Sequence, residues 1–167
     1  LFDLGLSQHA GMEAQCAAIA DDIAYNAHDI DDGLRSGLLS LAMLEQVPLA
    51  AGILAGVRAE YPHLDPVRAG HELVRRQITL MVEDVIAASA RALAEVAPRS
   101  ADDIRAAGRT IVAFSPDMAA REKQLKTFLY ANLYRNPEVM AEREKADRVV
   151  RDLFAAYMAD PAAMPEG

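Results

Sequence analysis

Cysteine and aromatic residues are scarce in the 167-residue chain, which contains one cysteine, no tryptophan and 5% aromatic residues. A single cysteine excludes an internal disulfide framework and is typical of proteins in the reducing cytoplasm. Alanine and leucine are abundant instead, and both favour helices over sheets. The composition therefore predicts an all-α protein in the cytoplasm.

Long hydrophobic runs are also absent. No run of about 18 apolar residues occurs, so no segment is expected to span a membrane. The opening residues Leu1 to Gly5 carry no basic residue, which argues against a signal peptide. Because 52% of the residues are hydrophobic and 25% are charged, we expect a single helical domain, residues 1–167, with a substantial core.

Positive charge is missing from the beginning of the chain. Residues 1–34 hold seven acidic residues and no lysine or arginine, whereas residues 121–151 hold eight basic and five acidic residues. The net charge of −8 argues against a nucleic-acid-binding surface, although a local basic patch is compatible with it. The acidic segment can be a solvated surface, a partner for the basic segment, or a set of carboxylates favoured by a helix dipole.

Apolar spacing and turn residues predict helices along the whole chain. The expected helices span approximately residues 11–27, 34–44, 49–60, 67–96, 100–107, 115–134 and 137–158. Gly33 is expected to interrupt or cap the first helix, residues 109–114 to be extended, and the tail from Asp160 to Gly167 to fray. The predicted fold class is an all-α multi-helix bundle.

The first helix carries an apolar stripe with a row of polar side chains beside it. The stripe consists of Met12, Cys16, Ile19, Ala20, Ile23 and Ala27, which predicts that Cys16 lies in the core. Asp21, Tyr25 and Asp29 follow at intervals of four residues, so they form one wall next to the stripe.

The three residues of this wall suit different parts of a nucleotide. Asp21 is flanked by alanines that allow close approach, and a carboxylate there is a plausible ligand for a hard cation. Tyr25 offers a phenol hydroxyl and a flat face, and Asp29 offers two acceptor oxygens for a sugar hydroxyl.

Three stretches carry a family resemblance. They are residues 13–35, with the sequence ADDIAYNAHDIDDGLR over residues 20–35, residues 125–135, with LKTFLY followed by Tyr134 and Arg135, and residues 149–154, VVRDLF. The chain resembles the C-terminal portion of bacterial deoxynucleoside triphosphate triphosphohydrolases, the dGTPase-like proteins of the HD-domain superfamily. Residues 1–35 would carry their late active-site motif and residues 36–167 their helical C-terminal region.

The resemblance implies a site and a reaction. The family's metal set is a histidine, a His-Asp doublet and a distant aspartate, which Asp21 matches. Tyr25 matches a tyrosine near the triphosphate and sugar, and Asp29 an aspartate that accepts from the 3′-hydroxyl. The implied reaction releases tripolyphosphate and a deoxynucleoside from a dNTP, with Mg²⁺ or Mn²⁺, or else Fe²⁺ or Co²⁺, as the divalent metal.

The chain lacks part of the family pattern. The first histidine and the His-Asp doublet should lie well before Asp21, and the chain does not begin with methionine. We therefore expect an N-terminal HD half elsewhere in a longer protein, and no catalysis by this chain alone. The expected partners are a dNTP substrate and a second copy of the chain, with nucleic acid as a possible effector and no membrane.

Two other interpretations stay open. His9 with His28-Asp29 could form a small metal site, but these positions are too close in sequence for ligands that lie on separate helices. The other two histidines, His63 and His71, are expected at the surface. The chain could also be a non-catalytic helical module for oligomerisation or regulatory nucleotide binding.

A group of four residues near position 130 has two interpretations as well. The group consists of Lys126, Tyr130, Tyr134 and Arg135. We favour the interpretation in which its tyrosines pack in the core and its basic side chains reach solvent. Alternatively, its helix could be the cationic counterpart of the acidic wall and contact phosphate or a neighbouring subunit.

Overall fold

The computed structural model describes residues 8–164, and over that range its regular elements are all helices, with no strand. Its elements are α1 (Met12–Ser36), α2 (Leu41–Leu44), α3 (Pro48–Glu60), α4 (Pro66–Val96), α5 (Ala101–Arg105), α6 (Pro116–Leu129), the π-helix η1 (Tyr130–Tyr134), α7 (Pro137–Ala159) and the 3-10 turn η2 (Pro161–Ala163). The all-α prediction is confirmed. The statement about Leu1 to Gly5 lies outside the described residues, and the single domain stays a prediction.

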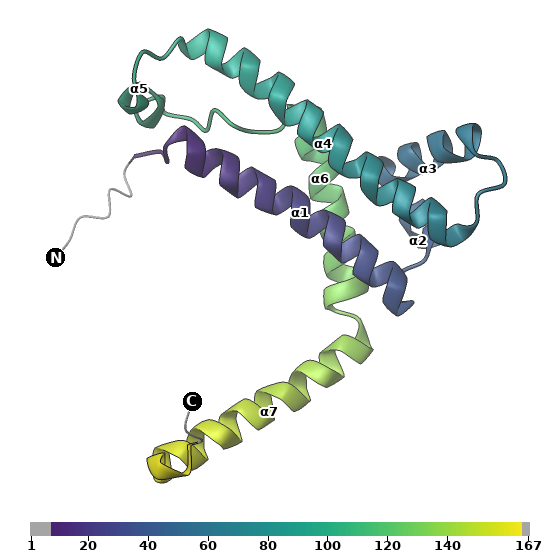
Figure 1. The fold of residues 1–167 in the computed structure, drawn as a ribbon, viewed down its shortest axis with the longest axis vertical. Coiled ribbons are helices and arrows are strands. Elements are labelled where there is room, and N and C mark those ends of the chain that lie inside the picture. Colours follow the sequence, from purple (N-terminus) through teal and green to yellow (C-terminus); the bar gives the residue numbers. More distant parts are fainter. Residues whose placement is uncertain (1–7, 165–167) are drawn as a thin grey trace.

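Four helices, α1, α3, α4 and α6, pack around one core. α1 and the long α4 run side by side, and α6 crosses behind them (Figure 1). The largest fully buried apolar side chains come from these four helices, from α2 and from the loop before α6: Ile30, Leu44, Leu54, Leu73, Met81, Ile111, Leu125 and Leu129. α1 therefore has one face in the core and one face that remains available for other contacts.

The helix starts agree with the capping signals in the sequence. Ser100 and Asp103 form a reciprocal capping box at α5, and Ser115 and Asn136 cap α6 and α7. Ser115 is also held by Asp84 of α4, whose two carboxylate oxygens accept from the Ser115 backbone N–H at 2.7 Å and from its hydroxyl at 2.6 Å. This pair fixes the start of α6 against α4.

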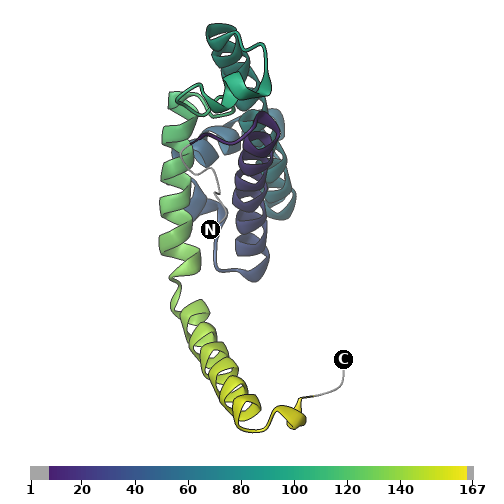
Figure 2. The same ribbon diagram turned by 90° about the vertical axis from the view of Figure 1, so that its left-hand side faces the viewer.

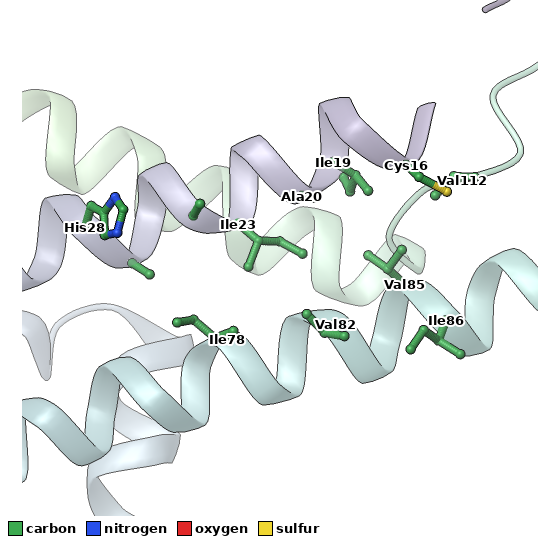
Figure 3. Close-up of a pocket in the computed structure, with 12 residues that line it drawn as sticks. Cys16, Ile19, Ala20, Ile23, His28, Ile78, Val82, Val85, Ile86 and Val112 are labelled. Atoms are coloured by element: carbon green, nitrogen blue, oxygen red, sulfur yellow. The ribbon is translucent and has the colours of Figure 1, made fainter. Parts of the chain in front are cut away.

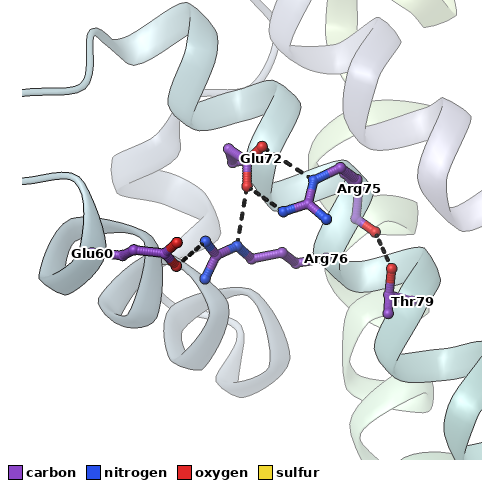
Figure 4. Close-up of polar contacts among 5 residues, drawn as sticks. All are labelled: Glu60, Glu72, Arg75, Arg76 and Thr79. Atoms are coloured by element: carbon purple, nitrogen blue, oxygen red, sulfur yellow. Dashed lines mark hydrogen bonds and ion pairs between the residues drawn. The ribbon is translucent and has the colours of Figure 1, made fainter.

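Charged side chains tie α3 to α4 on the outside of the bundle. Arg76 of α4 donates to Glu60 of α3 and to Glu72, which also accepts two hydrogen bonds from Arg75 (Figure 4). The hydrogen bonds from Arg75 and then Arg76 lower the pKa of Glu72 to about 2. Glu60 and Arg75 are exposed and Glu72 and Arg76 are half-buried, so solvent still screens the network and it stabilises the fold only modestly.

The prediction that Gly33 ends the first helix is wrong. α1 continues to Ser36, and Gly37 ends it in the left-handed conformation at φ 77°. Gly33 instead lets Leu39 approach: a Cβ at position 33 would lie 2.5 Å from Leu39 Cδ1, and the Leu39 N–H donates to the Gly33 oxygen at 2.8 Å. The expected helix 34–44 is consequently reduced to α2.

The prediction of an extended segment at 109–114 is also wrong, because a buried side chain holds this segment as a loop. The Gln15 carboxamide oxygen accepts from the backbone N–H groups of Ile111 at 2.8 Å and Val112 at 3.0 Å. Its nitrogen donates to the Ala10 oxygen at 2.7 Å. One side chain of α1 therefore satisfies the backbone groups that a strand would otherwise have paired.

α7 leaves the bundle. After the π-helix η1 it points away from the other helices (Figure 2), and none of its residues is buried. Its end is followed by η2, where we expected a frayed tail; residues 165–167 of that tail lie outside the described range. None of the helices between residues 8 and 164 combines the length and apolar composition that a membrane crossing requires.

The close contact at Gly33 gives a direct test of the fold. We expect Gly33→Ala to lower the free energy of unfolding by about 1 kcal/mol, because overpacking Leu39, which is buried, outweighs the gain in helix propensity. Gly52→Ala in α3 is the matched control, since a Cβ there meets nothing within 4 Å. It should raise the free energy of unfolding by up to about 1 kcal/mol. Chemical denaturation measures both, and equal stabilisation would contradict the packing.

Candidate substrate site on helix α1

The predicted wall of Asp21, Tyr25 and Asp29 lies on the outer face of α1. Asp21 is exposed, Tyr25 is 61% exposed and Asp29 is half-buried. At about 1.5 Å per residue the three side chains span about 12 Å along the helix. They therefore form a row that can meet an elongated ligand.

A hydrogen bond from η1 orients the last member of this row. The Tyr134 hydroxyl donates to Asp29 Oδ2, across 105 positions of sequence. This hydrogen bond is the main reason that the pKa of Tyr134 is raised to about 12, and partial burial adds to it. Among residues 8–164 no hydrogen bond engages the other carboxylate oxygen of Asp29, which can therefore accept from a ligand hydroxyl.

The π-helix η1 sets the position of Tyr134. Its wider turn is closed by the Arg135 backbone N–H, which donates to the Tyr130 oxygen five residues earlier at 3.0 Å. A single π turn inserts one residue and rotates everything after it, and such turns are frequent at functional sites. In this chain the turn presents Tyr134 to α1 before the chain departs along α7.

Opposite charges join α1 to α6 next to this hydrogen bond. Lys126 of α6 lies 2.9 Å from Asp22 and 2.6 Å from Glu122, and Asn26 of α1 donates to Glu122 at 3.2 Å. Of the three interpretations of the acidic segment, pairing with the basic segment is therefore confirmed for Asp22. The site residues Asp21 and Tyr25 lie beyond these pairs, on the open face of α1.

The prediction that the tyrosines near position 130 pack in the core is wrong. Tyr130 is 53% exposed and Tyr134 is 45% exposed, so neither packs in the core. Lys126 is the cationic counterpart of the acidic helix, as the alternative predicted, while Arg135 stacks over and donates to Tyr130. Contact of this group with phosphate or another subunit stays a prediction.

On its other flank, α1 borders an open apolar groove. The groove lies between α1 and α4 and has a volume of about 350 Å³. Ile19, Ile23, Val82 and Val85 point into the space between the two helices (Figure 3). Cys16 lies at one end of the groove and is exposed, so the prediction of a core cysteine is wrong. The groove ends at His28, about two helical turns from Asp21.

No metal site is complete within the described residues. Between residues 8 and 164 no group of three or more histidine, cysteine, aspartate or glutamate side chains is placed to hold a metal ion. His28, His63 and His71 are exposed, as expected, and His9 with His28-Asp29 forms no such group. One carboxylate at Asp21 does not fit a catalytic divalent metal unless further ligands come from outside these residues.

Sequence reasoning found the row on α1 but missed how α6 and the groove complete its surroundings. Tyr134 and Lys126 form a separate group in the sequence, because no sequence pattern indicates which residues of two different helices come into contact. Gln15 and Asn26 were missed as buried residues. Their polar side chains interrupt the apolar pattern, and that interruption was the available signal.

The hydrogen bond between Asp29 and Tyr134 has a measurable consequence. We expect Asp29→Asn to lower the pKa of Tyr134 from about 12 towards its usual value of about 10, because the neutral phenol loses its carboxylate acceptor. Since the raised pKa favours the protonated phenol in the folded state, its stabilising contribution is present below pH 10 and lost between about pH 10 and 12.

An ultraviolet difference titration that follows the formation of tyrosinate measures the pKa of Tyr134. The chain has five tyrosines, and the titration step that disappears in Tyr134→Phe is the one that belongs to Tyr134. An identical titration for the unchanged chain and Asp29→Asn would contradict the hydrogen bond.

Comparison with known proteins identifies long relatives of this chain. The sequence model of the phosphohydrolase-associated domain matches residues 112–167. A deoxyguanosinetriphosphate triphosphohydrolase-like protein 1 of Mesorhizobium japonicum is 65% identical over 165 residues, 99% of this chain and 41% of the relative. Similarly named proteins of Brucella ovis and Rhizobium leguminosarum bv. trifolii are 59% and 58% identical over 99% and 98% of this chain.

The relatives are much longer than this chain. The chain spans about two fifths of the length of the relatives that it matches, 41% for the Brucella ovis protein and 40% for the Rhizobium protein. The likeness nevertheless runs through almost every residue of the chain, including α1 and the groove. The resemblance first seen in residues 13–35 is therefore confirmed by the comparison.

Proposed function

Because the chain belongs to the family of deoxyguanosinetriphosphate triphosphohydrolase-like proteins, we propose that it is the C-terminal portion of an enzyme that hydrolyses deoxynucleoside triphosphates. The reaction would release tripolyphosphate and a deoxynucleoside, in the cytoplasm. The observation that carries the proposal is the open row of Asp21, Tyr25 and Asp29 on α1, in the part of the sequence that resembles the family's late active-site motif.

Each residue of the row has a proposed task. Asp21 is an exposed carboxylate and contributes one oxygen ligand to a divalent metal, Mg²⁺ or Mn²⁺ in the first instance. The metal stabilises the negative charge of the phosphates when it is bound. Because the described residues supply one ligand only, the others come from the remaining three fifths of the longer protein, and this chain alone is inactive.

The sugar end of the substrate is assigned to the other end of the row. Asp29 is held by Tyr134 and accepts a hydrogen bond from the 3′-hydroxyl with its free oxygen. Tyr25 lies between Asp21 and Asp29, and its exposed phenol contacts the triphosphate and the sugar. The order of the side chains along α1 therefore follows the order of the chemical groups along a dNTP.

Replacement of Asp21 tests this proposal. We expect Asp21→Asn and Asp21→Ala, in the full-length protein, to reduce metal-dependent tripolyphosphate release to background, because the metal loses a charged ligand. The control is Asp152→Asn on α7, an exposed aspartate away from α1, which should keep its activity. Circular dichroism should show unchanged helicity for all three variants. Normal activity of the Asp21 variants would refute the assignment.

A second candidate function is oligomerisation without catalysis, and α7 favours it. Val150, Leu153, Phe154 and Met158 share one side of α7, and each is at least 47% exposed. An apolar helix face of this kind can pair with the same face of a second copy, since a two-fold contact is self-complementary. Regulatory binding of a nucleotide or of nucleic acid by such an assembly is compatible with either candidate.

Sedimentation velocity tests the role of α7. We expect a dimer or larger species for the unchanged chain and a monomer for Phe154→Glu, because a charge within the apolar face opposes pairing. Val67→Glu is the control, because Val67 is as exposed as Phe154 (68% against 67%) but lies on α4. This variant should keep the oligomeric state of the unchanged chain. A monomer at all concentrations for the unchanged chain would remove this candidate.

A further inference from the structure

The groove between α1 and α4 is an apolar surface without an occupant in the described residues. It follows α1 from Cys16 to His28, about 18 Å at about 1.5 Å per residue, and α4 from Ile78 to Ile86. Of the side chains that line it, Val82 is 39% exposed and Ile86 is 64% exposed. Contiguous apolar surface of this length, next to charged groups, is typical of a site where another segment packs.

The length of the groove and its two helical sides suit a further helix. α1 and α4 run side by side in opposite directions (Figure 1), and two such helices with apolar side chains pointing into the space between them (Figure 3) form a cradle in which a third helix can pack. Three turns of helix cover about the length from Cys16 to His28. The occupant therefore needs an apolar stripe of about three turns.

Charge makes a second copy of this chain a poor occupant. Within residues 8–34 there are six acidic side chains and no lysine or arginine. A two-fold contact through the groove would bring the acidic outer faces of two α1 helices together, which costs free energy through like-charge repulsion. A suitable occupant has neutral or cationic side chains, such as histidine or arginine, beside its apolar stripe.

The length of the relatives provides a source for such a helix. About three fifths of their length lies outside the region that this chain matches. Asp21 lies within one turn of the groove's edge, so a segment packed there is well placed to bring further ligands to it.

We propose that the groove lined by Ile19, Ile23, Val82 and Ile86 binds an amphipathic helix from the remaining part of the full-length protein, with cationic or imidazole side chains towards Asp21. This inference rests on the proposed membership in a longer enzyme. It adds the surface through which the two parts join, and it assigns Cys16 and Ile86 to a buried interface. Packing at this surface would couple the assembly of the protein to the completion of the site.

Cys16 provides a probe for this interface, because it is exposed at the end of the groove and is the only cysteine of the chain. The experiment measures the rate of alkylation of Cys16 by N-ethylmaleimide, from the mass spectrum of the peptide that contains it. We expect rapid alkylation in the 167-residue chain and a rate at least about tenfold slower in the full-length protein, since a covered thiol reacts only when the interface opens.

Matched variants separate the groove from other causes of protection. In the full-length protein, Ile86→Glu should restore the alkylation rate to within about threefold of that of the chain alone, because the buried charge opposes packing. Val67→Glu, on the same helix but outside the groove, should leave Cys16 protected.

Two results would overturn the proposal. One is equal alkylation of Cys16 in the chain alone and in the full-length protein. The other is protection in the chain alone that increases with concentration, which would assign the groove to a second copy. Because the readout needs no nucleotide or metal, an active Asp21→Asn variant with a protected Cys16 would refute the proposed function and leave the interface in place.

Discussion

The burial of one face of α1 against α4 and α6 is the constraint on which the other features depend. Ile23 and Ile30 anchor that face in the core, and Gln15 holds the loop before α6 by accepting two backbone hydrogen bonds. With this face fixed, the regular turn of the helix places Asp21 and Tyr25 on the open side. The candidate site is thus a consequence of packing behind it, and its side chains need no special backbone geometry.

The side chains on the two flanks of α1 differ in whether they have contact partners within the described chain. On the α6 side, Lys126 neutralises Asp22 and Tyr134 donates to Asp29, so the polar groups have partners within the chain. On the α4 side, the apolar groove has none among the described residues. This asymmetry is what a surface made by one part of a larger protein would present, and it agrees with relatives more than twice as long.

Much of this arrangement could be predicted from the sequence, and the limits have physical reasons. Capping at Ser100, Ser115 and Asn136 is local, so the helix starts were correct. Asp21, Tyr25 and Asp29 share a face through helix geometry alone. The roles of Gly33 and Cys16 were wrong because they depend on tertiary contacts, with Leu39 and with the open side of α4. The hydrogen bond to Tyr134 joins residues 105 positions apart through a π turn, which no local pattern indicates.

The central claim is that α1 supplies one wall of a triphosphohydrolase site that is completed from outside the chain. The most direct test measures tripolyphosphate release from dGTP, with Mg²⁺ or Mn²⁺, by the 167-residue chain and by the full-length protein under the same conditions. We expect release by the full-length protein and none by the chain alone. Metal-dependent release by the chain alone would contradict it, as would an inactive full-length protein across all four dNTPs.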